Sequence, residues 1–496
     1  MDRGVSRRTV LAFLGAGLGQ AAFAAPPTRS LRPVARGASH AKRAVAGSDA
    51  IIANAGLSGR VTFAVADART GTMLEGTRAA TGTPPASVAK AITALYALSE
   101  LGPSHSFITR IVATGPISGG VLQGDLVLVG GADPTLDTNG LAALVKGLKD
   151  KGIREVRGNF RVAEGFLPYT RSIDAGQPDH LGYSPAVSGI ALNFNRVHFE
   201  WKRSGNSYGL TMQARTDKYR PAVYVTKMQL ANRDLPVYTY SDGGDSDNWT
   251  VSRRALGKGG SRWLPVRKPA LYAGDVFQTL ARASGIVLKN PQVVSRIPQG
   301  TTLAAVQSAE LRVLLRDMLR YSTNITAEMI GMAATRARTG KVSSLKGSAS
   351  EMSRWAASAL GAKGTKLVDH SGLGDASKMT ASGMVAALVN VHQSSGLRPI
   401  LKPFAMRDAQ RRVIKDHPIQ VDAKTGTLNY VSGLAGYMTA RDGTDLAFAI
   451  FCADETTRGR ISKANREAPQ GARGWNRRAK ALQQKLIERW DALYGS

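Results

Sequence analysis

The sequence predicts an α/β (α+β) protein in which a large, mainly β insertion interrupts a domain made of antiparallel strands and helices. Two strand-like runs, 61–67 and 72–74, flank a turn near the N-terminus, and two more, 428–437 and 446–451, flank a turn near the C-terminus. Between about 106 and about 295, short β-rich runs alternate with turns. A chain of 496 residues also exceeds what one hydrophobic core usually organises, so we expect two or more domains.

The N-terminus predicts an export signal. Arg7 and Arg8 precede a short apolar run that ends in a small-x-small pattern at Ala24, which is typical of the twin-arginine type. The run is too short and too rich in glycine and alanine for a membrane-spanning helix. We therefore expect a signal peptide over 1–24 and a periplasmic protein.

Composition and secondary-structure pattern divide the remainder of the chain into segments. Residues 25–47 are rich in Pro, Arg, Ser and Ala without periodicity, and we expect a disordered basic leader there. The β-rich texture that begins after residue 105 gives way to helical patterning beyond about 295. We therefore expect one domain built from 48–105 and 296–496, with inserted subdomains at 106–295.

The chain is strongly basic, with 66 Lys and Arg against 36 Asp and Glu and a formal net charge of +30. Such a surplus favours polyanions. Together with an export signal, it favours peripheral association with an anionic cell-wall polymer or a membrane surface, and we expect no nucleic-acid partner. The sequence contains no zinc-ligand spacing, P-loop or dinucleotide fingerprint, so we expect no metal and no cofactor.

Two features near the C-terminus concern packing. Cys452, the single cysteine, lies in an apolar strand-like run and is expected to be a buried, inert thiol. Leu482, Leu486 and Trp490 recur at helical spacing, opposite basic residues. We expect this helix to pack on a sheet, with a membrane-surface helix as the alternative.

A serine and a lysine stand three residues apart where a helix is predicted to begin, which puts Ser87 and Lys90 on one helical face. A lysine can take the proton of a serine hydroxyl only if burial or neighbouring cations lower its pKa. The apolar residues from Lys90 to Gly102 predict a helix buried on every side, which meets that condition. Taken alone, Ser87 is better explained as a helix cap. A second Ser-x-x-Lys, at 343–346, has no buried run after it and indicates a polar helix end.

A polar break between two helical patterns carries the next candidate pair. Helical periodicity over 310–320 stops before Ser322 and Asn324 and then resumes. Such a break can present both side chains to a cleft, although either residue can also cap the second helix. A competing Ser-x-Asn at 246–248 lies among Asp and Gly residues and indicates a solvated turn, with a calcium loop as a weak alternative.

The third candidate stretch is Lys424-Thr425-Gly426-Thr427, at the leading edge of the C-terminal strand pair. A glycine has no side chain, so a substrate backbone could lie along the strand there. The look-alikes 69–71 and 338–340 lack the lysine and lie in predicted turns.

In this order, Ser-x-x-Lys, Ser-x-Asn and Lys-Thr-Gly are the motifs of penicillin-binding proteins and class A β-lactamases. About 235 residues separate Ser87 from Ser322. The chain therefore resembles the D-alanyl-D-alanine carboxypeptidases/endopeptidases of the class C penicillin-binding protein type, the penicillin-binding protein 4 family, which carry a large insertion there. The segments 130–136, 192–197 and 369–373 also look like family segments. The resemblance implies a transpeptidase/β-lactamase-like domain, with an antiparallel sheet flanked by helices.

The resemblance also implies roles for the polar motif residues. Ser87 would be the nucleophile that forms an acyl-enzyme, and Lys90 would be its general base. Ser322 would relay a proton between a lysine and the leaving amine, and Asn324 would hydrogen-bond a peptide carbonyl of the substrate. Lys424 would supply positive potential.

The remaining motif residues are implied to bind substrate. Thr425 and Thr427 would hold the terminal carboxylate of D-alanine, on either side of Gly426, and the backbone N–H groups of Ser87 and Thr427 would form an oxyanion hole. The implied substrate is the peptidoglycan stem peptide, and β-lactam antibiotics would be covalent inhibitors. One departure concerns His370, because the family usually has Asp-Gly-Ser-Gly-Leu where this chain has a histidine in second place.

Two other functions stay open at this stage. A β-lactam hydrolase or esterase of the same fold is disfavoured by the long interval and by the lack of a class A Glu-x-x-Leu-Asn segment. A non-catalytic cell-wall-binding protein is disfavoured because every polar catalytic position is filled. The sequence does not distinguish carboxypeptidase from endopeptidase preference.

Overall fold

The computed structural model describes residues 45–394 and 396–495. The expected signal peptide at 1–24 lies outside the described residues, as does nearly all of the expected leader at 25–47.

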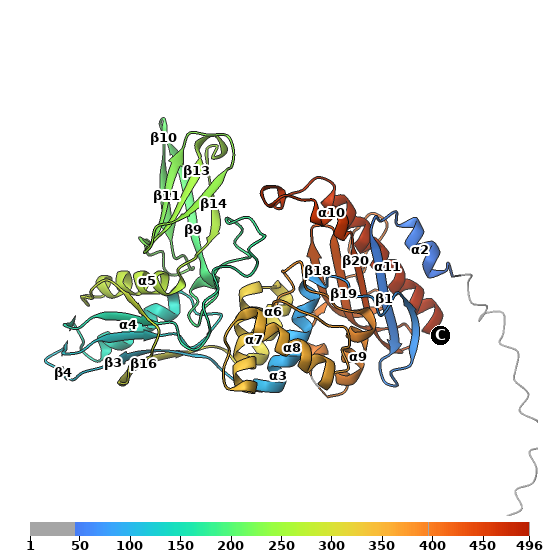
Figure 1. The fold of residues 1–496 in the computed structure, drawn as a ribbon, viewed down its shortest axis with the longest axis horizontal. Coiled ribbons are helices and arrows are strands. Elements are labelled where there is room, and N and C mark those ends of the chain that lie inside the picture. The colour runs from blue at the N-terminus through green and yellow to red at the C-terminus, as the bar shows by residue number, and fades with distance from the viewer. Residues whose placement is uncertain (1–44, 395, 496) are drawn as a thin grey trace, which may run out of the picture. The chain divides into compact units, whose positions relative to one another are not determined.

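Strands from the two ends of the sequence pair in one antiparallel sheet of six strands, in the order β17-β18-β19-β20-β1-β2 (Figure 1). β1 pairs with β20 along its whole length, so the N-terminal hairpin completes a sheet begun by the C-terminal strands. Both predicted strand pairs are therefore confirmed. The strands are β1 (Arg60–Asp67), β2 (Met73–Thr77), β17 (Lys402–Pro403), β18 (Gln420–Leu428), β19 (Val431–Thr439) and β20 (Asp445–Ala453).

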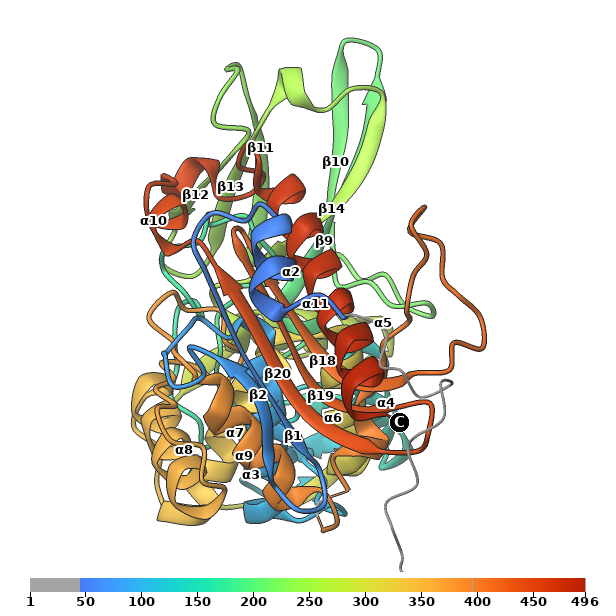
Figure 2. The same cartoon turned by 90° about the vertical axis from the view of Figure 1, so that its right-hand side faces the viewer.

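The two faces of this sheet carry side chains of different size. On β20, Phe448 and Ile450 belong to one core and Ala447 and Ala449 to the other, because successive side chains of a strand alternate. Helix α11 (Ala472–Tyr494) packs on the face with the larger residues. In Figure 2 this helix lies in front of the sheet. The predicted packing of the C-terminal helix on a sheet is confirmed, and its apolar side is covered.

The opposite face carries mostly alanines, together with Tyr437 and Phe451, and most helices of the domain lie in the layer that packs on this side. Helix α3 lies at the centre of this layer, with residues 89–97 all buried, and it ends at Gly102 with a φ of 81°. The prediction of a helix buried on every side is confirmed. The helices of the domain are α2 (Ser48–Asn54), α3 (Ala89–Leu101), α6 (Leu311–Tyr321), α7 (Asn324–Thr339), α8 (Leu345–Ala359), α9 (Ala381–Val391), α10 (Glu455–Gly459) and α11.

The segment between α3 and α6 is mainly β, as predicted. A mixed five-stranded sheet, β15-β8-β6-β3-β16, is accompanied by three smaller sheets, β10-β9-β14, β11-β13-β12 and β4-β5-β7 (Figure 1). The elements are β3 (Ile108–Ala113), β4 (Ile117–Ser118), β5 (Val121–Leu122), β6 (Leu126–Val129), α4 (Thr138–Asp150), β7 (Glu155–Val156), β8 (Phe160–Ala163), β9 (Arg196–Ser204), β10 (Ser207–Gln213), β11 (Thr226–Ala231), β12 (Tyr238–Asp242), β13 (Asp247–Ser252), β14 (Gly259–Pro265), α5 (Pro269–Ala283), β15 (Gln292–Val294) and β16 (Thr301–Gln307).

Three details of the insertion differ from expectation. The insertion contains two helices, α4 and α5, which pack against each other among its strands. β16 pairs with β3, so this sheet extends beyond residue 295. Asp247 is not in a solvated turn: it starts β13, is fully buried, and accepts a hydrogen bond from the Arg267 amide at 2.8 Å.

Two further expectations concern single features. Cys452 is buried, as predicted, and burial raises the pKa of its thiol to about 12. Across residues 45–394 and 396–495, no helix has both the length and the apolar character needed to cross a membrane.

Candidate active site

Ser87 lies in a short 3₁₀ turn, Ala86–Val88, that runs directly into α3. Lys90 is in the first turn of α3, and its side chain is fully buried. The Lys90 Nζ lies 2.8 Å from Ser87 Oγ and also contacts Asn324 Oδ1 at 2.8 Å and the carbonyl oxygen of Ser371 at 2.9 Å. The expected nucleophile and base are in direct contact, and two further acceptors fix the amine in place.

The charge state of Lys90 is set by opposing effects. Burial lowers the pKa of Lys90 to about 8, although the nearby charges of Glu328 and Asp369 act in the other direction. A buried ammonium loses hydration, which favours the neutral amine. A neutral amine is what a general base needs in order to accept the hydroxyl proton of a serine.

The break between α6 and α7 directs two side chains toward the lysines. Ser322 has a left-handed backbone, with a φ of 59° and a ψ of 38°, which ends α6. Its Oγ accepts a hydrogen bond from the Lys424 Nζ at 3.0 Å. Asn324 contacts Lys90 through Oδ1, and its Nδ2 donates to the carbonyl oxygen of Tyr183 at 2.9 Å. Neither side chain caps α7, so the capping alternative does not hold.

The Lys-Thr-Gly segment lies on β18, beside the turn that carries Ser87. Lys424 is buried, and burial together with the charges of Lys90 and Lys402 holds its pKa well below the usual range. The Thr425 and Thr427 side chains are both exposed. At Gly426 a Cβ atom would lie 2.7 Å from the Pro85 carbonyl oxygen and 2.9 Å from the Ser87 amide nitrogen.

This geometry changes the reason for a glycine at position 426. From the sequence, we expect the missing side chain to leave room for a substrate backbone along the strand. In the structure, the glycine lets β18 lie against the backbone of the Ser87 turn, since any side chain would collide with it.

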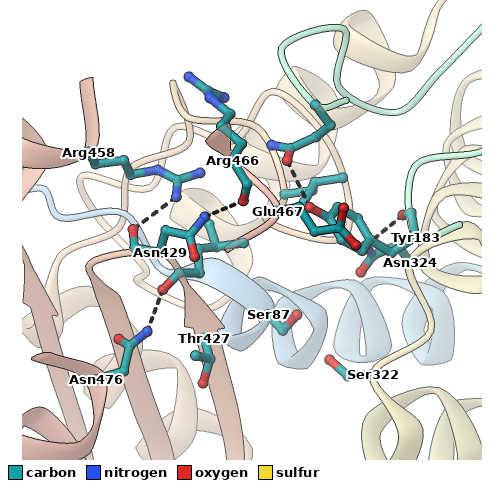
Figure 3. Close-up of a pocket in the computed structure, with 13 residues that line it drawn as sticks. Ser87, Tyr183, Ser322, Asn324, Thr427, Asn429, Arg458, Arg466, Glu467 and Asn476 are labelled. Atoms are coloured by element: carbon teal, nitrogen blue, oxygen red, sulfur yellow. Dashed lines mark hydrogen bonds between the residues drawn. The ribbon is translucent and has the colours of Figure 1, made fainter. Parts of the chain in front are cut away.

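A cavity of about 340 Å³ opens at these residues (Figure 3). Ser87, Ser322, Asn324 and Thr427 line it together, so three segments far apart in sequence converge on one space. Tyr183 from the insertion lies beside Asn324 in Figure 3 and closes that side. The remaining lining residues are Gln177, Leu373, Leu428, Asn429, Arg458, Arg466, Glu467 and Asn476.

Sequence reasoning missed Glu328, a buried carboxylate behind Lys90. Its two oxygens accept hydrogen bonds from the backbone amides of His370, at 2.8 Å, and Ser371, at 3.0 Å. The carbonyl of Ser371 in turn accepts from Lys90. Burial raises the pKa of the Glu328 carboxyl, and the nearby Asp369 adds to this. An acidic residue within the apolar run 325–330 was the signal that could have found it.

The loop that carries Ser371 is also held from inside. Asp369 accepts hydrogen bonds from the backbone amides of Gly372, at 2.6 Å, and Gly374, at 2.5 Å. Gly372 has a φ of 76°, and a Cβ there would lie 1.9 Å from the carbonyl oxygen of Ala86. The loop therefore fits closely against the turn that carries the nucleophile.

His370, the departure from the family pattern, is a packing residue. Its ring is fully buried, with Nε2 2.8 Å from Ser348 Oγ, and burial lowers its pKa to about 3, so it stays neutral. A Cβ at Gly331 of α7 would lie 2.2 Å from the ring. The space for the imidazole thus comes from a glycine on the facing helix.

Charged residues that were not predicted border the cavity on another side. Arg458 and Arg466 both bind Asp375, through contacts of 2.9 Å from Arg458 Nε and 3.0 Å from an Arg466 terminal nitrogen. Glu467 is paired with Arg262 and His180, each at 2.8 Å. No sequence motif predicts these residues. They come together only because the insertion packs against the C-terminal segment.

Ser87 can pass its proton to a buried lysine, and it lies beside a sheet that is covered by helices. This combination defines a serine acyl-transfer hydrolase. The chain belongs to the D-Ala-D-Ala carboxypeptidase 3 (S13) family, whose model matches residues 45–471. It is a serine-type D,D-peptidase, as the three motifs predict.

Relatives that match over most of their length agree with this assignment. A D-alanyl-D-alanine carboxypeptidase from an Actinomadura strain is 27% identical over an alignment of 473 residues, and the match covers 86% of this chain and 86% of the relative. Another, from Haemophilus influenzae, is 23% identical over an alignment of 410 residues, and the match covers 77% of this chain and 83% of the relative.

Solved structures confirm the predicted fold. The crystal structure of penicillin binding protein 4 from Haemophilus influenzae matches with a TM-score of 0.73 at 20% identity, covering 89% of this chain and 100% of that one. The same protein complexed with a β-lactam matches with a TM-score of 0.70 at 19% identity, covering 91% and 100%.

Proposed function

We propose that this enzyme removes the terminal D-alanine from peptidoglycan stem peptides and also cuts D,D cross-links, through an acyl-enzyme on Ser87. The observation that carries the proposal is the contact between Ser87 and a buried Lys90 whose pKa is lowered. Relatives named D-alanyl-D-alanine carboxypeptidases support the choice of substrate.

In the first step, neutral Lys90 accepts the proton of Ser87 while Oγ attacks the carbonyl carbon of the penultimate D-alanine. The new C–O bond gives a tetrahedral oxyanion, which the backbone N–H groups of Ser87 and Thr427 stabilise. The C–N bond then breaks, and the leaving amine takes a proton that Ser322 relays from Lys90 or Lys424. Water hydrolyses the ester, releases the shortened peptide and restores the Ser87 hydroxyl.

Binding is assigned to the rim of the cavity. Asn324 is fixed by Lys90 and by the Tyr183 carbonyl, so its amide is held where a substrate carbonyl can meet it. Lys424 contributes positive potential, and Thr425 and Thr427 hold the terminal carboxylate from an exposed strand edge. In this arrangement, the ammonium group of Lys424 and the two threonine hydroxyls of β18 bind the terminal D-alanine, which is the residue that leaves.

Penicillin should acylate Ser87 and leave slowly. The amine expelled from a penicillin stays tethered to the acyl group and obstructs water. Among the described residues that line the cavity, Glu467 is the only carboxylate. Burial raises its pKa, but hydrogen bonds from His180 and Arg262 outweigh this and lower it, which makes Glu467 a weak base for activating water.

Location is a separate part of the proposal. The twin arginines at Arg7 and Arg8 support export to the periplasm, where peptidoglycan lies, and the net charge of +30 supports a peripheral association with anionic wall or membrane components.

The test of the activity uses purified peptidoglycan fragments and mass analysis of the products. We expect loss of one D-alanine from pentapeptide stems and conversion of cross-linked dimers to monomers, with neither product in Ser87→Ala. Intact pentapeptide and intact dimer after long incubation with folded protein would contradict the proposal.

A further inference from the structure

A second cavity, of about 390 Å³, adjoins the one just described and shares Tyr183, Ser322 and Asn324 with it. These three residues lie on one side of the first cavity in Figure 3. The second cavity, here called the Arg196 cavity, is also lined by Arg196 and Tyr321. Of the described residues that line it, none comes from β18, so it offers space beyond the strand that receives the terminal residue.

Arg196 forms no ion pair with any carboxylate in the part of the chain that the structure describes. Its guanidinium lies over the rings of Phe194, at 5.4 Å, and Trp263, at 5.8 Å. Its Nε is buried and has no hydrogen-bond partner among the described residues. Burial lowers the pKa of Arg196, and no carboxylate within residues 45–394 or 396–495 raises it or forms an ion pair with it. By contrast Arg215, on the same insertion, is paired with Glu200 at 2.8 Å.

The backbone just before Arg196 is strained, and this conformation directs the Arg196 side chain toward the cavity. Asn193, Phe194 and Asn195 have φ values of 50°, 58° and 50°, a left-handed run that non-glycine residues rarely adopt. The two asparagines are held by hydrogen bonds, Asn193 Nδ2 to Thr138 Oγ1 and Asn195 Nδ2 to the Ala186 carbonyl, both at 2.9 Å. The fold therefore maintains a costly turn whose result is that Phe194 and Arg196 reach the cavity.

We propose that the Arg196 cavity binds a carboxylate of the peptide substrate other than its C-terminal one. A guanidinium presents its donors in a planar fork that matches a carboxylate, and a partly buried one gains most from such a partner. Phe194 and Tyr321 supply aromatic surface for the carbon chain that bears the carboxylate. This inference rests on the proposed function, because the ligand is part of the peptide that the enzyme cuts.

Such a carboxylate can come from the stem peptide that is attacked or from the second stem of a cross-linked dimer. The test uses two pairs of synthetic substrates. In the first pair, a linear peptide ending in D-Ala-D-Ala carries an acidic side chain either as free acid or as primary amide. In the second pair, cross-linked dimers carry that difference in the amine-donating stem. The kcat/KM of each is measured.

We expect the parent enzyme to prefer acid over amide by about tenfold or more in one pair, the order of a charge-assisted bidentate contact. The pair that shows the preference identifies the source. Arg196→Gln should abolish the preference, and Arg196→Lys should restore part of it. Because Arg196 also packs on aromatic rings, Tyr321→Glu is a second variant: it places a negative charge at an exposed position of the cavity and should depress cleavage of the acid selectively.

Arg215→Gln is the matched control, since it removes a partly buried arginine of the insertion away from the cavity, and it should keep the preference. Cleavage of all substrates without an acid preference in either pair would overturn this inference alone. So would an equal loss of acid and amide cleavage in Arg196→Gln with the preference of Tyr321→Glu unchanged. If the folded parent enzyme cuts no peptide at all, the proposed function itself fails.

Discussion

The two lysines of the site have opposite surroundings, although both are buried. Lys90 faces the carboxyl groups of Glu328 on α7 and Asp369 on the neighbouring loop, which raise its proton affinity. At Lys424 the effects act in one direction, because burial and the charges of Lys90 and Lys402 all lower its pKa. Burial outweighs the carboxylates at Lys90, so the pKa of both lysines lies below that of a free lysine. Both amines are therefore weaker bases than a free lysine, and the site can hold an amine that is neutral near physiological pH.

The first prediction concerns Glu328→Gln. Removing a negative charge beside Lys90 lowers the pKa of this lysine further, because the ammonium form loses a favourable partner. Acylation needs neutral Lys90, so its acidic limb, expected near pH 8 in the parent from the pKa of about 8, should move to lower pH. The shift should be about one pH unit or less, because burial raises the pKa of Glu328 and reduces its charge in this range. Asp369 and Lys424 remain as the other charged groups near Lys90.

The measurement is the rate of penicillin acylation between about pH 5 and pH 10. Glu351→Gln is the control, since this carboxylate lies on α8 and pairs with Arg338 and Arg354. A limb that moves to higher pH in Glu328→Gln would contradict this account of how Lys90 is tuned.

The second prediction uses the left-handed backbone of Ser322. Glycine adopts that conformation without a steric penalty, so Ser322→Gly should be about 1 kcal/mol more stable than Ser322→Ala. Both variants lose the hydroxyl, and both should lose peptide turnover by about a hundredfold, the usual contribution of a proton relay. Urea unfolding and kcat measured on the same preparations test this. Full turnover in Ser322→Gly would remove Ser322 from the mechanism.

Turn residues and hydrophobic periodicity predicted those strands and helices whose formation depends mainly on the local sequence. The hairpin β1–β2, the strand pair β19–β20 and the break between α6 and α7 all follow from turn residues and periodicity. Helix α5 was missed because its packing is tertiary: at Gly274 a Cβ would lie 2.6 Å from Pro291 Cβ, a contact that no local pattern announces. Asp247 was misplaced because Arg267 and Tyr240, which bind it, come from other elements.

The third prediction concerns how α11 is attached to the sheet. Trp490 is fully buried with its ring 5.7 Å from those of Phe63 and Phe448, and its Nε1 donates to Glu75 Oε2 at 3.1 Å. Trp490→Ala should lower the free energy of unfolding by about 3–5 kcal/mol, because it leaves a cavity and removes one hydrogen-bond donor from Glu75, which stays paired with Arg489. Tyr224→Ala, at a position that is 66% exposed, is the control and should change it by less than about 0.5 kcal/mol. Equal effects in urea unfolding would contradict the packing described.

At the scale of the whole molecule, the site exists only where three remote segments meet. Motif chemistry was enough to name Ser87, Lys90 and Lys424, because each needs a particular side chain at a fixed local spacing. It was not enough to name Glu328 or Arg196. Their positions depend on how the loop that follows α8, and the insertion, pack around the motifs, which local sequence does not specify.

The fourth prediction concerns export, for which the signal itself is the only basis. Replacing both Arg7 and Arg8 by lysine keeps the charge and removes the pair that a receptor reads. Unprocessed precursor should then accumulate in the cytoplasm, while the parent is processed, as fractionation and immunoblotting would show. Normal processing of the double variant would exclude the twin-arginine route, although not export by another route.

The central claim is that Ser87 is the nucleophile of an acyl-enzyme, and its most direct test is mass spectrometry of the protein mixed with excess penicillin. We expect a long-lived adduct of one penicillin per chain, located on the peptide that contains Ser87 and missing in Ser87→Ala. Rapid turnover of the drug would indicate a β-lactam hydrolase instead of a peptidase. An adduct that persists in Ser87→Ala would contradict the assignment of the nucleophile and, with it, the mechanism.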